Sequence, residues 1–370
     1  MIVVAKIGTS SISDAAGRID EAAIAAFCAQ VAAETTRGHR VVVVTSGAIS
    51  AGLPVLAMPL SDVAARRQRD PATFQAVSAV GQSRLMRVYD AALGEHGLVG
   101  GQVLLAPLDF TVRQQYLHAR STLTRLLDLH VVPIVNENDA IADDEIRFGD
   151  NDRLAALVAH LIYADLLVLL TDQHGLYTAD PRLHAGASLI EEIVEVEQTL
   201  EVAAGGAGTV RGSGGMASKV AAAKMAAWSG VRAVIARADR PRVLCDAIAG
   251  AEGVGTVLVP RERRLNARKL WIAFATGSSG TVLVDEGARG ALLQRGVSLL
   301  PAGVTDVKGD FQADDAVEIA GPGGRVFAKG LCRFDADSLR NLAGRRTVDL
   351  PEGAPHEVVH RDDMVVLPQP

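Results

Sequence analysis

The sequence predicts an α/β fold, a three-layer αβα sandwich with a mainly parallel central sheet, followed by a small β-rich domain. Three observations predict it. Short apolar runs of strand length alternate with helical patterns through most of the chain. These runs are apolar throughout, as in parallel sheets that helices cover on both faces. The last part of the chain instead has short alternating runs broken by Gly-Pro and Gly-Gly, which are typical of a compact β-rich unit.

Each predicted strand of the central sheet ends in small or polar residues. The strands are the runs IVVA, VVVV, VVPIV and LLVLL at 2–5, 41–44, 131–135 and 166–170. They lead into KIGTS, TSGA, NEND and TD. Ligands of open α/β sheets bind beyond the carboxyl ends of the strands. One polar strand end is ordinary, but four in succession predict a site along this edge.

Helical patterns separate the strands, for example at 20–36 and 151–162. A further helix is predicted after the run RGSGGMASKV at 211–220, because apolar residues recur at helical spacing from Met216. Glycines before a helix allow backbone N–H groups to approach an anion, and Lys219 could reach back to it. The run is not a Walker A motif, and by itself it is also typical of a flexible surface loop.

Length and spacing predict two domains. A chain of 370 residues is too long for one ordinary domain. We expect the α/β domain at 1–262, a linker at 263–277, the β-rich domain at 278–356 and a C-terminal tail at 357–370.

Composition excludes several classes of protein. The net charge is −6, and residues 275–356 hold nine Lys or Arg against eleven Asp or Glu, so we do not expect a nucleic-acid partner. Cys28, Cys245 and Cys332 lack metal-binding spacing, which indicates reduced thiols. No apolar segment has the length of a membrane span or a signal peptide. We therefore expect a cytoplasmic protein with no membrane partner.

Two polar segments allow more than one interpretation. Lys6 ends an apolar strand, where a lysine commonly extends into solvent, but it could also be a fixed cation beside a phosphate. The Asp150-Asn151-Asp152 run suits a helix N-cap, and it could also direct polar atoms at a substrate.

Several segments together resemble the amino acid kinase family, and within it the glutamate 5-kinases. The segments are KIGTS (6–10), VVVVTSGAISAG (41–52), AVGQSRLM (79–86), VVPIVNENDA (131–140), FGDNDRLAALVA (148–159), LLTDQHGLYTADPR (169–182) and GSGGMASKVAAA (212–223). The β-rich part resembles a PUA domain, a small β-barrel module. The sequence departs from the family pattern before AVGQ, at residues 66–75, and at Ser213, where threonine is usual.

The resemblance implies an activity and its partners. The reaction would be the ATP-dependent phosphorylation of the γ-carboxylate of L-glutamate to L-glutamyl 5-phosphate, the first step of proline synthesis, with proline as a feedback inhibitor. ATP and Mg²⁺ are implied, with the metal carried by ATP rather than by protein ligands. A carboxylate nucleophile is already ionised at neutral pH, so no general base is required. A homo-oligomer, dimer or tetramer, is also implied.

The resemblance also implies the roles of particular residues. The catalytic residues would be Lys6, Lys219 and Asp150, with Asp150 organising the two lysines or a water on the metal. Glutamate would be bound by Asp139 through its ammonium group and by Ser46 and Asn151, which donate to carboxylate oxygens. The residues that would bind ATP are Lys6, Gly8, Thr9, Thr171, Asp172, Ser213, Gly214, Gly215, Met216, Ala217, Ser218 and Lys219.

Two other functions remain open on the sequence. A related kinase could act on aspartate, N-acetylglutamate, UMP or carbamate, because the phosphate-handling residues do not distinguish acceptors. A protein that binds RNA through its PUA domain is the alternative from a different class, although the acidic balance of residues 275–356 disfavours it.

Overall fold

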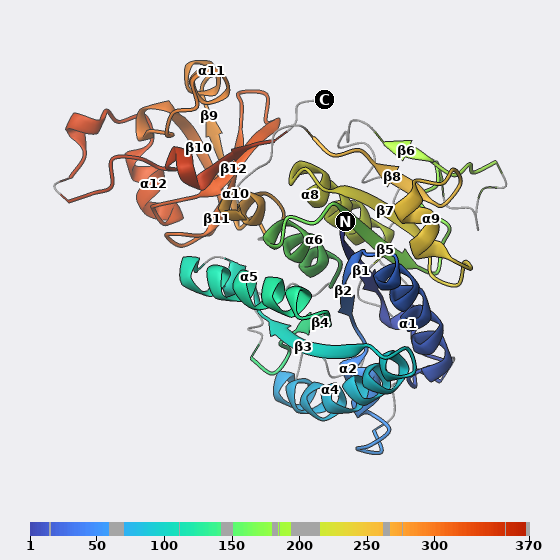
Figure 1. Cartoon of the computed structure of the whole chain (residues 1–370). Helices are drawn as coiled ribbons and strands as arrows, with labels where there is room; N and C mark the ends of the chain where they lie inside the picture. The colour runs from blue at the N-terminus through green and yellow to red at the C-terminus, as the bar shows by residue number, and fades with distance from the viewer. Residues whose placement is uncertain are drawn as a thin grey trace. The chain divides into compact units, whose positions relative to one another are not determined.

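The computed structural model describes residues 1–14, 16–58, 70–110, 112–141, 151–179, 184, 186–193, 215–261, 267–275, 277–351 and 353–367. The chain forms two compact units, Met1–Arg264 and Leu265–Pro370 (Figure 1). Each unit has its own buried core.

The first unit is built on an eight-stranded sheet in its described part. Its strand order is β3-β4-β2-β1-β5-β7-β8-β6. All neighbouring strands are parallel except β7 and β8. The strands are β1 (Ile2–Ile7), β2 (Arg40–Thr45), β3 (Val99–Leu105), β4 (Val131–Glu137), β5 (Leu166–Thr171), β6 (Glu192–Ile193), β7 (Arg232–Arg237) and β8 (Thr256–Leu258). This confirms the mainly parallel sheet that the apolar runs predict.

Helices cover both faces of this sheet, as Figure 1 shows. One face carries α1 (Glu21–Thr36), α2 (Ala48–Gly52), α4 (Pro71–Gly94) and α9 (Val243–Ala249), which pack on one another. The other carries α5 (Arg113–Asp128), α6 (Asn151–Leu161) and α8 (Met216–Trp228), and α6 packs against α8. Two 3₁₀ turns, Thr9–Ser11 and Pro107–Phe110, follow β1 and β3. The αβα sandwich is thereby confirmed.

The alternation of side chains along β1 decides where its lysine lies. Val3, Ala5 and Ile7 are buried in the core that α1 and α4 contribute to. Successive side chains of a strand point to opposite faces of the sheet. Val4 and Lys6 therefore lie on the other face, the one that α6 and α8 cover.

Gly81 lets α4 lie directly against α2. A Cβ atom at this position would be 1.7 Å from the carbonyl oxygen of Ala48 and 2.5 Å from the backbone nitrogen of Gly52. Neither backbone atom can move away without displacing α2, so the approach of the two helices requires glycine here.

We expect Gly81→Ala to destabilise the protein by about 3 kcal/mol or more, because α2 and α4 must separate to admit the methyl group. Gly94 is a matched control in the same helix, since a Cβ there meets nothing within 4 Å. Gly94→Ala should leave stability unchanged or raise it by up to about 1 kcal/mol. Urea unfolding followed by circular dichroism measures both. Equal unfolding midpoints for the two variants would contradict this account of the contact.

The second unit is β-rich, as the sequence predicts. In its described part a five-stranded sheet has the order β10-β9-β11-β12-β13, and β9 and β11 are its parallel pair. The strands are β9 (Gly280–Val284), β10 (Val304–Gly309), β11 (Ala316–Ala320), β12 (Val326–Leu331) and β13 (Met364–Val366). The helices are α10 (Ala267–Leu270), α11 (Glu286–Arg295) and α12 (Ala336–Leu342), with a π-helical turn at Trp271–Ala275 and 3₁₀ turns at Pro301–Gly303, Thr347–Asp349 and Arg361–Asp363. Phe311 and Phe327 lie in its core.

Both ends of this unit carry more structure than the sequence analysis expected. The segment 357–370, expected to be a tail, contains β13, which pairs with β12 through residues 364–366. The segment 263–277, expected to be a linker, contains α10 and the π-helical turn, where Leu270 and Ile272 are fully buried. Apolar side chains stabilise both segments, because burying Met364, Leu270 and Ile272 removes their surface from water.

Candidate active site

Two lysines from distant parts of the chain share one carboxylate. Lys6 extends from β1, Lys219 lies in the first turn of α8, and Asp152 lies in the first turn of α6. Lys6 Nζ is 2.5 Å from Asp152 Oδ1, and Lys219 Nζ is 3.1 Å from Asp152 Oδ2. The hydroxyl of Ser218 also donates to Asp152 Oδ2, at 2.9 Å. The face of β1 on which Lys6 lies brings the cluster together, because α6 and α8 pack over that face.

All three charged side chains are buried. Asp152 is 0% exposed, Lys6 4% and Lys219 6%. Burial acts to raise the pKa of the Asp152 carboxyl, but Lys6, Lys219 and the Ser218 hydroxyl outweigh it and hold this pKa well below its ordinary value. Two ammonium groups and one carboxylate are therefore held together away from water. Fixed ammonium groups form strong hydrogen bonds to phosphate oxygens.

The start of α8 adds to the attraction for an anion at this place. The helix begins at Met216, and its N-cap residue, Gly215, has no side chain to cap the first N–H groups. Backbone N–H groups at a helix N-terminus bind phosphates well, and the helix dipole favours negative charge there. Gly8 keeps space open beside Lys6, since a Cβ atom at position 8 would lie 3.3 Å from Lys6 Nζ. These features of the cluster suit a phosphate group.

The ends of β1, β5 and β7 lie side by side at the same edge of the sheet. Lys6 pairs in register with Leu169, and Thr171 pairs with Arg237. Thr171 is buried, and its hydroxyl donates to Asp172 Oδ1 at 3.1 Å. The backbone N–H of residue 238 donates to the Thr171 carbonyl at 2.7 Å. These contacts fix Thr171 and Asp172 on the edge that carries Lys6.

A chain of hydrogen-bonded side chains leads away from the lysines to β4. Asn151, beside Asp152 in α6, donates from Nδ2 to Ser46 Oγ at 2.8 Å and to Asn136 Oδ1 at 3.0 Å. Asn136 donates in turn to Gln82 Oε1 at 2.9 Å. Ser46 directly follows β2, and Asn136 lies near the end of β4; the carboxyl ends of these strands meet at this edge. We call this connected set of polar side chains the polar wall: Ser46, Gln82, Asn136 and Asn151.

Asn151 presents an acceptor, whereas the sequence analysis expected it to donate to a substrate carboxylate. Both of the bonds of its Nδ2 described above are to protein atoms. Its Oδ1 is buried and has no hydrogen-bond partner among the described residues. The hydroxyl of Ser46 accepts from Asn151, so its own proton is left to donate.

Asp139 lies two residues beyond the end of β4 and contacts α4. Ser78 donates from Oγ to Asp139 Oδ2 at 2.7 Å. Ser78 and Gln82 are one helical turn apart on α4, so both face the end of β4. This face of α4 therefore lines the same part of the molecule as Ser46, Asn151 and Asp139.

A model of the amino acid kinase family matches residues 1–237. The chain belongs to the amino acid kinase family. A model of the PUA domain matches residues 280–353. This member of the family is 48% identical over 370 residues to a glutamate 5-kinase of Frankia casuarinae, with 99% of this chain and 96% of that protein covered. It is 41% identical over 369 residues to a glutamate 5-kinase of Pelobacter propionicus, covering 99% and 97%. A solved UMP kinase of Bacillus anthracis matches 72% of the chain and 98% of its own length, at 14% identity and a TM-score of 0.49.

The residues expected to bind ATP in this amino acid kinase fall into two groups. Those that the structure describes lie at the carboxyl ends of β1 and β5 or at the start of α8: Lys6, Gly8, Thr9, Thr171, Asp172, Gly215, Met216, Ala217, Ser218 and Lys219. Ser213 and Gly214 lie outside the described residues, as does Asp150. Among the described residues, the carboxylate that contacts both lysines is that of Asp152.

Sequence reasoning missed Asp152, Asn136, Gln82 and Ser78. Asp152 stands in the quoted GDND motif, and the signal for it was present as the second acid of that motif. Ser78 and Gln82 are four residues apart, a spacing that places both on one side of a helix. This spacing could have marked a polar face. Asn136 directly follows the apolar run of β4.

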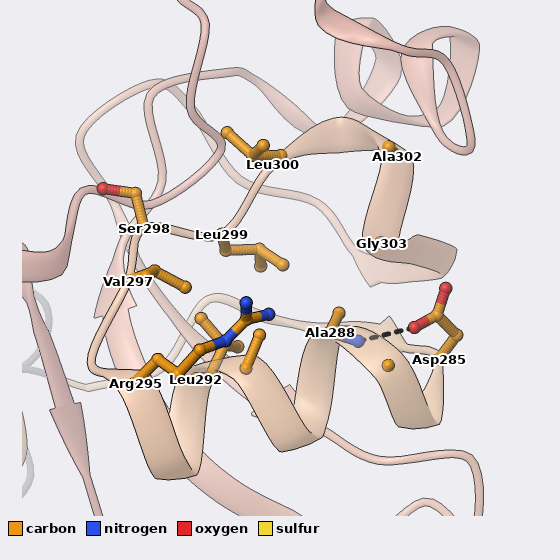
Figure 2. A pocket seen from close by; sticks show the side chains of 12 residues that line it. Asp285, Ala288, Leu292, Arg295, Val297, Ser298, Leu299, Leu300, Ala302 and Gly303 are labelled. Carbon is orange, nitrogen blue, oxygen red and sulfur yellow. Dashed lines mark hydrogen bonds between the residues drawn. The ribbon is translucent and has the colours of Figure 1, made fainter.

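The PUA domain has a pocket of its own, shown in Figure 2. Its volume is about 370 Å³, and it lies between α11 and residues 297–303. Leu292 and Leu299 contribute apolar walls, and Arg295 is the one basic residue that lines it. Asp285 caps α11 by accepting from the backbone N–H of Ala288 at 2.7 Å. The pocket is mainly apolar and is not built like the lysine cluster.

No helix in the described parts of the chain is both long and apolar enough to cross a membrane.

Proposed function

We propose that this member of the amino acid kinase family transfers the γ-phosphoryl group of ATP to the γ-carboxylate of L-glutamate, giving L-glutamyl 5-phosphate and ADP. The observation that carries the proposal is the buried pair of ammonium groups, Lys6 and Lys219, on Asp152. A wall of amide and hydroxyl groups adjoins this pair and suits an amino acid. The similarity to glutamate 5-kinases along nearly the whole chain supports glutamate as the acceptor.

The two lysines would act on the phosphoryl group during its transfer. Charge spreads over the phosphoryl oxygens in the transition state, and fixed cations stabilise it. Asp152 would act as a positioning residue, because its carboxylate offsets the repulsion between Lys6 and Lys219 and orients both ammonium groups. ATP would bind as its magnesium complex, in which the metal neutralises phosphate charge. Both Asp152 oxygens already contact ammonium groups, so phosphate oxygens and water are better ligands for the metal than this carboxylate.

The acceptor needs orientation more than activation. Its γ-carboxylate is ionised at neutral pH, so it attacks without losing a proton. Alignment with the phosphoryl group then supplies most of the acceleration. Ser46 would donate to a substrate carboxylate, Asp139 would pair with the substrate ammonium, and the Asn151 Oδ1 atom would accept from that ammonium.

A coupled assay of ADP release tests the proposal. L-Glutamate should support turnover with MgATP, whereas aspartate, N-acetylglutamate, UMP and carbamate should support little. Hydroxylamine should trap the product as the γ-hydroxamate, which identifies an acyl phosphate. Faster turnover with any other acceptor of this panel would replace glutamate as the substrate.

Asp139→Ala should raise the KM for glutamate by about 10- to 100-fold, because the substrate ammonium loses its charged partner. The KM for ATP should change little, since Asp139 lies beyond the end of β4 rather than at the lysine cluster. Asp128→Ala is the control, because Asp128 is an exposed acid on α5. Initial rates at varied glutamate measure the effect. Saturation by glutamate at the wild-type concentration would remove Asp139 from the substrate site.

The finer features of the proposed function follow from the resemblance to glutamate 5-kinases. We propose that the reaction is the first step of proline synthesis in the cytoplasm, that proline inhibits by competing with glutamate, and that the chain forms a dimer or tetramer. Proline should then raise the apparent KM for glutamate without lowering the rate at saturation. Sedimentation equilibrium reports the oligomeric state.

A further inference from the structure

One backbone N–H group fixes which way the side-chain amides of Asn136 and Gln82 are turned. The backbone N–H of Glu137 donates to Asn136 Oδ1 at 2.9 Å. A backbone N–H can only donate, so this contact holds Asn136 Oδ1 on that side of its amide. The Asn136 Nδ2 atom must then point the other way, toward Gln82.

The hydrogen bond from Asn136 determines the orientation of the Gln82 amide. Its Oε1 accepts from Asn136 Nδ2 at 2.9 Å, which turns its Nε2 away from Asn136. Gln82 is 8% exposed, and this Nε2 is buried without a hydrogen-bond partner among the described residues. A buried donor left unpaired is unfavourable, and such groups are almost always satisfied in proteins. The amide is thus a donor held ready for an acceptor atom that the described residues do not supply.

The place of Gln82 in the wall indicates which part of a substrate would meet it. The hydrogen bonds run from Asn151, next to Asp152, through Asn136 to Gln82. Gln82 therefore stands at the end of this chain of contacts that is farther from the lysines. On the same face of α4, one turn earlier, Ser78 binds Asp139. A substrate whose reacting carboxylate faces Lys6 and Lys219 would direct its other end to this region.

We propose that Gln82 is a specificity-determining residue whose Nε2 donates to the α-carboxylate of the amino-acid acceptor. Asn136 acts as a positioning residue, because its amide, oriented by the Glu137 N–H, in turn orients the amide of Gln82. The α-carboxylate supplies the acceptor that Nε2 lacks. This inference rests on the proposed function, since it assigns a contact within the same acceptor site.

The test substitutes the Gln82 amide and removes the substrate group that it would contact. Gln82→Glu keeps an oxygen to accept from Asn136 and replaces the Nε2 donor with a second oxygen. Gln82→Met has a similar length and removes both polar atoms. 4-Aminobutyrate retains the γ-carboxylate and the ammonium of glutamate but lacks the α-carboxylate. Ser83→Ala, at an exposed neighbouring position of α4, controls for local changes in the helix.

We expect both Gln82 variants to raise the KM for L-glutamate by about 10- to 100-fold, with the kcat and the KM for ATP nearly unchanged. The binding of 4-aminobutyrate, measured as its inhibition constant against glutamate, should stay within about twofold of wild type. Gln82→Glu should also shift preference from L-glutamate toward its α-amide, because the new carboxylate repels an α-carboxylate and accepts from an amide. Ser83→Ala should match wild type in every measurement.

An equal loss for glutamate and 4-aminobutyrate would overturn the inference, because the effect would then not depend on the α-carboxylate. A fall in kcat with an unchanged glutamate KM would overturn it as well. A thermal unfolding midpoint close to wild type for either Gln82 variant ensures that folding is not being measured. The failure of the proposed function shows itself differently, since wild-type protein would then release no ADP with glutamate.

Discussion

Replacing Lys219 or Lys6 by alanine should lower kcat by about 10³-fold. Each ammonium group is fixed on Asp152. In the proposed reaction each would stabilise charge that grows on the phosphoryl oxygens in the transition state. The KM for glutamate should change far less, by about threefold or less, because the lysines do not hold the amino-acid end of the acceptor. Steady-state rates at saturating ATP and glutamate measure the loss.

Lys308 provides the control for these lysine variants. Its ammonium group is exposed on β10 in the second unit, so Lys308→Ala removes the same charge without touching the lysine cluster. That variant should keep wild-type kcat. Near-normal turnover of Lys219→Ala or Lys6→Ala would show that the corresponding lysine does not act on the transferred group.

The central sheet and its functional edge were predictable because they depend on local patterns. Uninterrupted apolar runs such as VVVV are typical of strands with both faces buried, as in a parallel sheet between layers of helices. Carboxyl ends of parallel strands then meet at one edge by topology alone. The placement of Lys6 and Thr171 along a common edge follows from this without any knowledge of side-chain contacts.

The contact of Asp152 with the two lysines was not predictable from spacing. Successive residues of a helix point about 100° apart, so the direction of each side chain depends on the position at which the helix begins. The sequence GDND is compatible with a start at several residues. In the structure α6 begins at Asn151, and Asp152 faces Lys6.

The role of Gln82 was hidden for a different reason. The spacing of Ser78 and Gln82 could at most have marked a polar face, because the role that we propose for Gln82 depends on the amide of Asn136 in another element. The orientation of that amide depends in turn on the backbone N–H of Glu137. Polar networks of this kind are set by tertiary contacts, so composition and periodicity do not show which atoms they join.

Asp152→Asn should lower both stability and turnover, because it leaves two buried ammonium groups without their shared counter-charge. Breaking a buried ion pair by removing one partner destabilises a protein by about 3–5 kcal/mol. We also expect kcat to fall by about 10²-fold or more, since the lysines lose the carboxylate that aims them. Urea unfolding and steady-state rates measure the two effects. Stability and turnover close to wild type would exclude Asp152 as the positioning residue.

Acid should remove the difference in stability between wild type and Asp152→Asn. The folded-state pKa of Asp152 lies below its ordinary value of 3.8, so the wild type gains stability from this carboxylate above about pH 3.8. That gain is lost as the pH falls through the lower folded-state pKa. The free energies of unfolding of the two proteins should therefore converge below about pH 3.8 and differ by a constant amount at higher pH.

A double variant separates the structural role of Asp152 from its role in turnover. In Asp152→Asn the two ammonium groups repel each other without the carboxylate that they share, so adding Lys6→Met should restore much of the lost stability. Turnover should stay low, because one of the two cations that act on the phosphoryl group is then missing. Recovery of stability without recovery of kcat would show that the carboxylate balances the lysines in the fold and that both lysines are needed for the reaction. A double variant less stable than Asp152→Asn would mean that repulsion between the lysines is not what the carboxylate relieves.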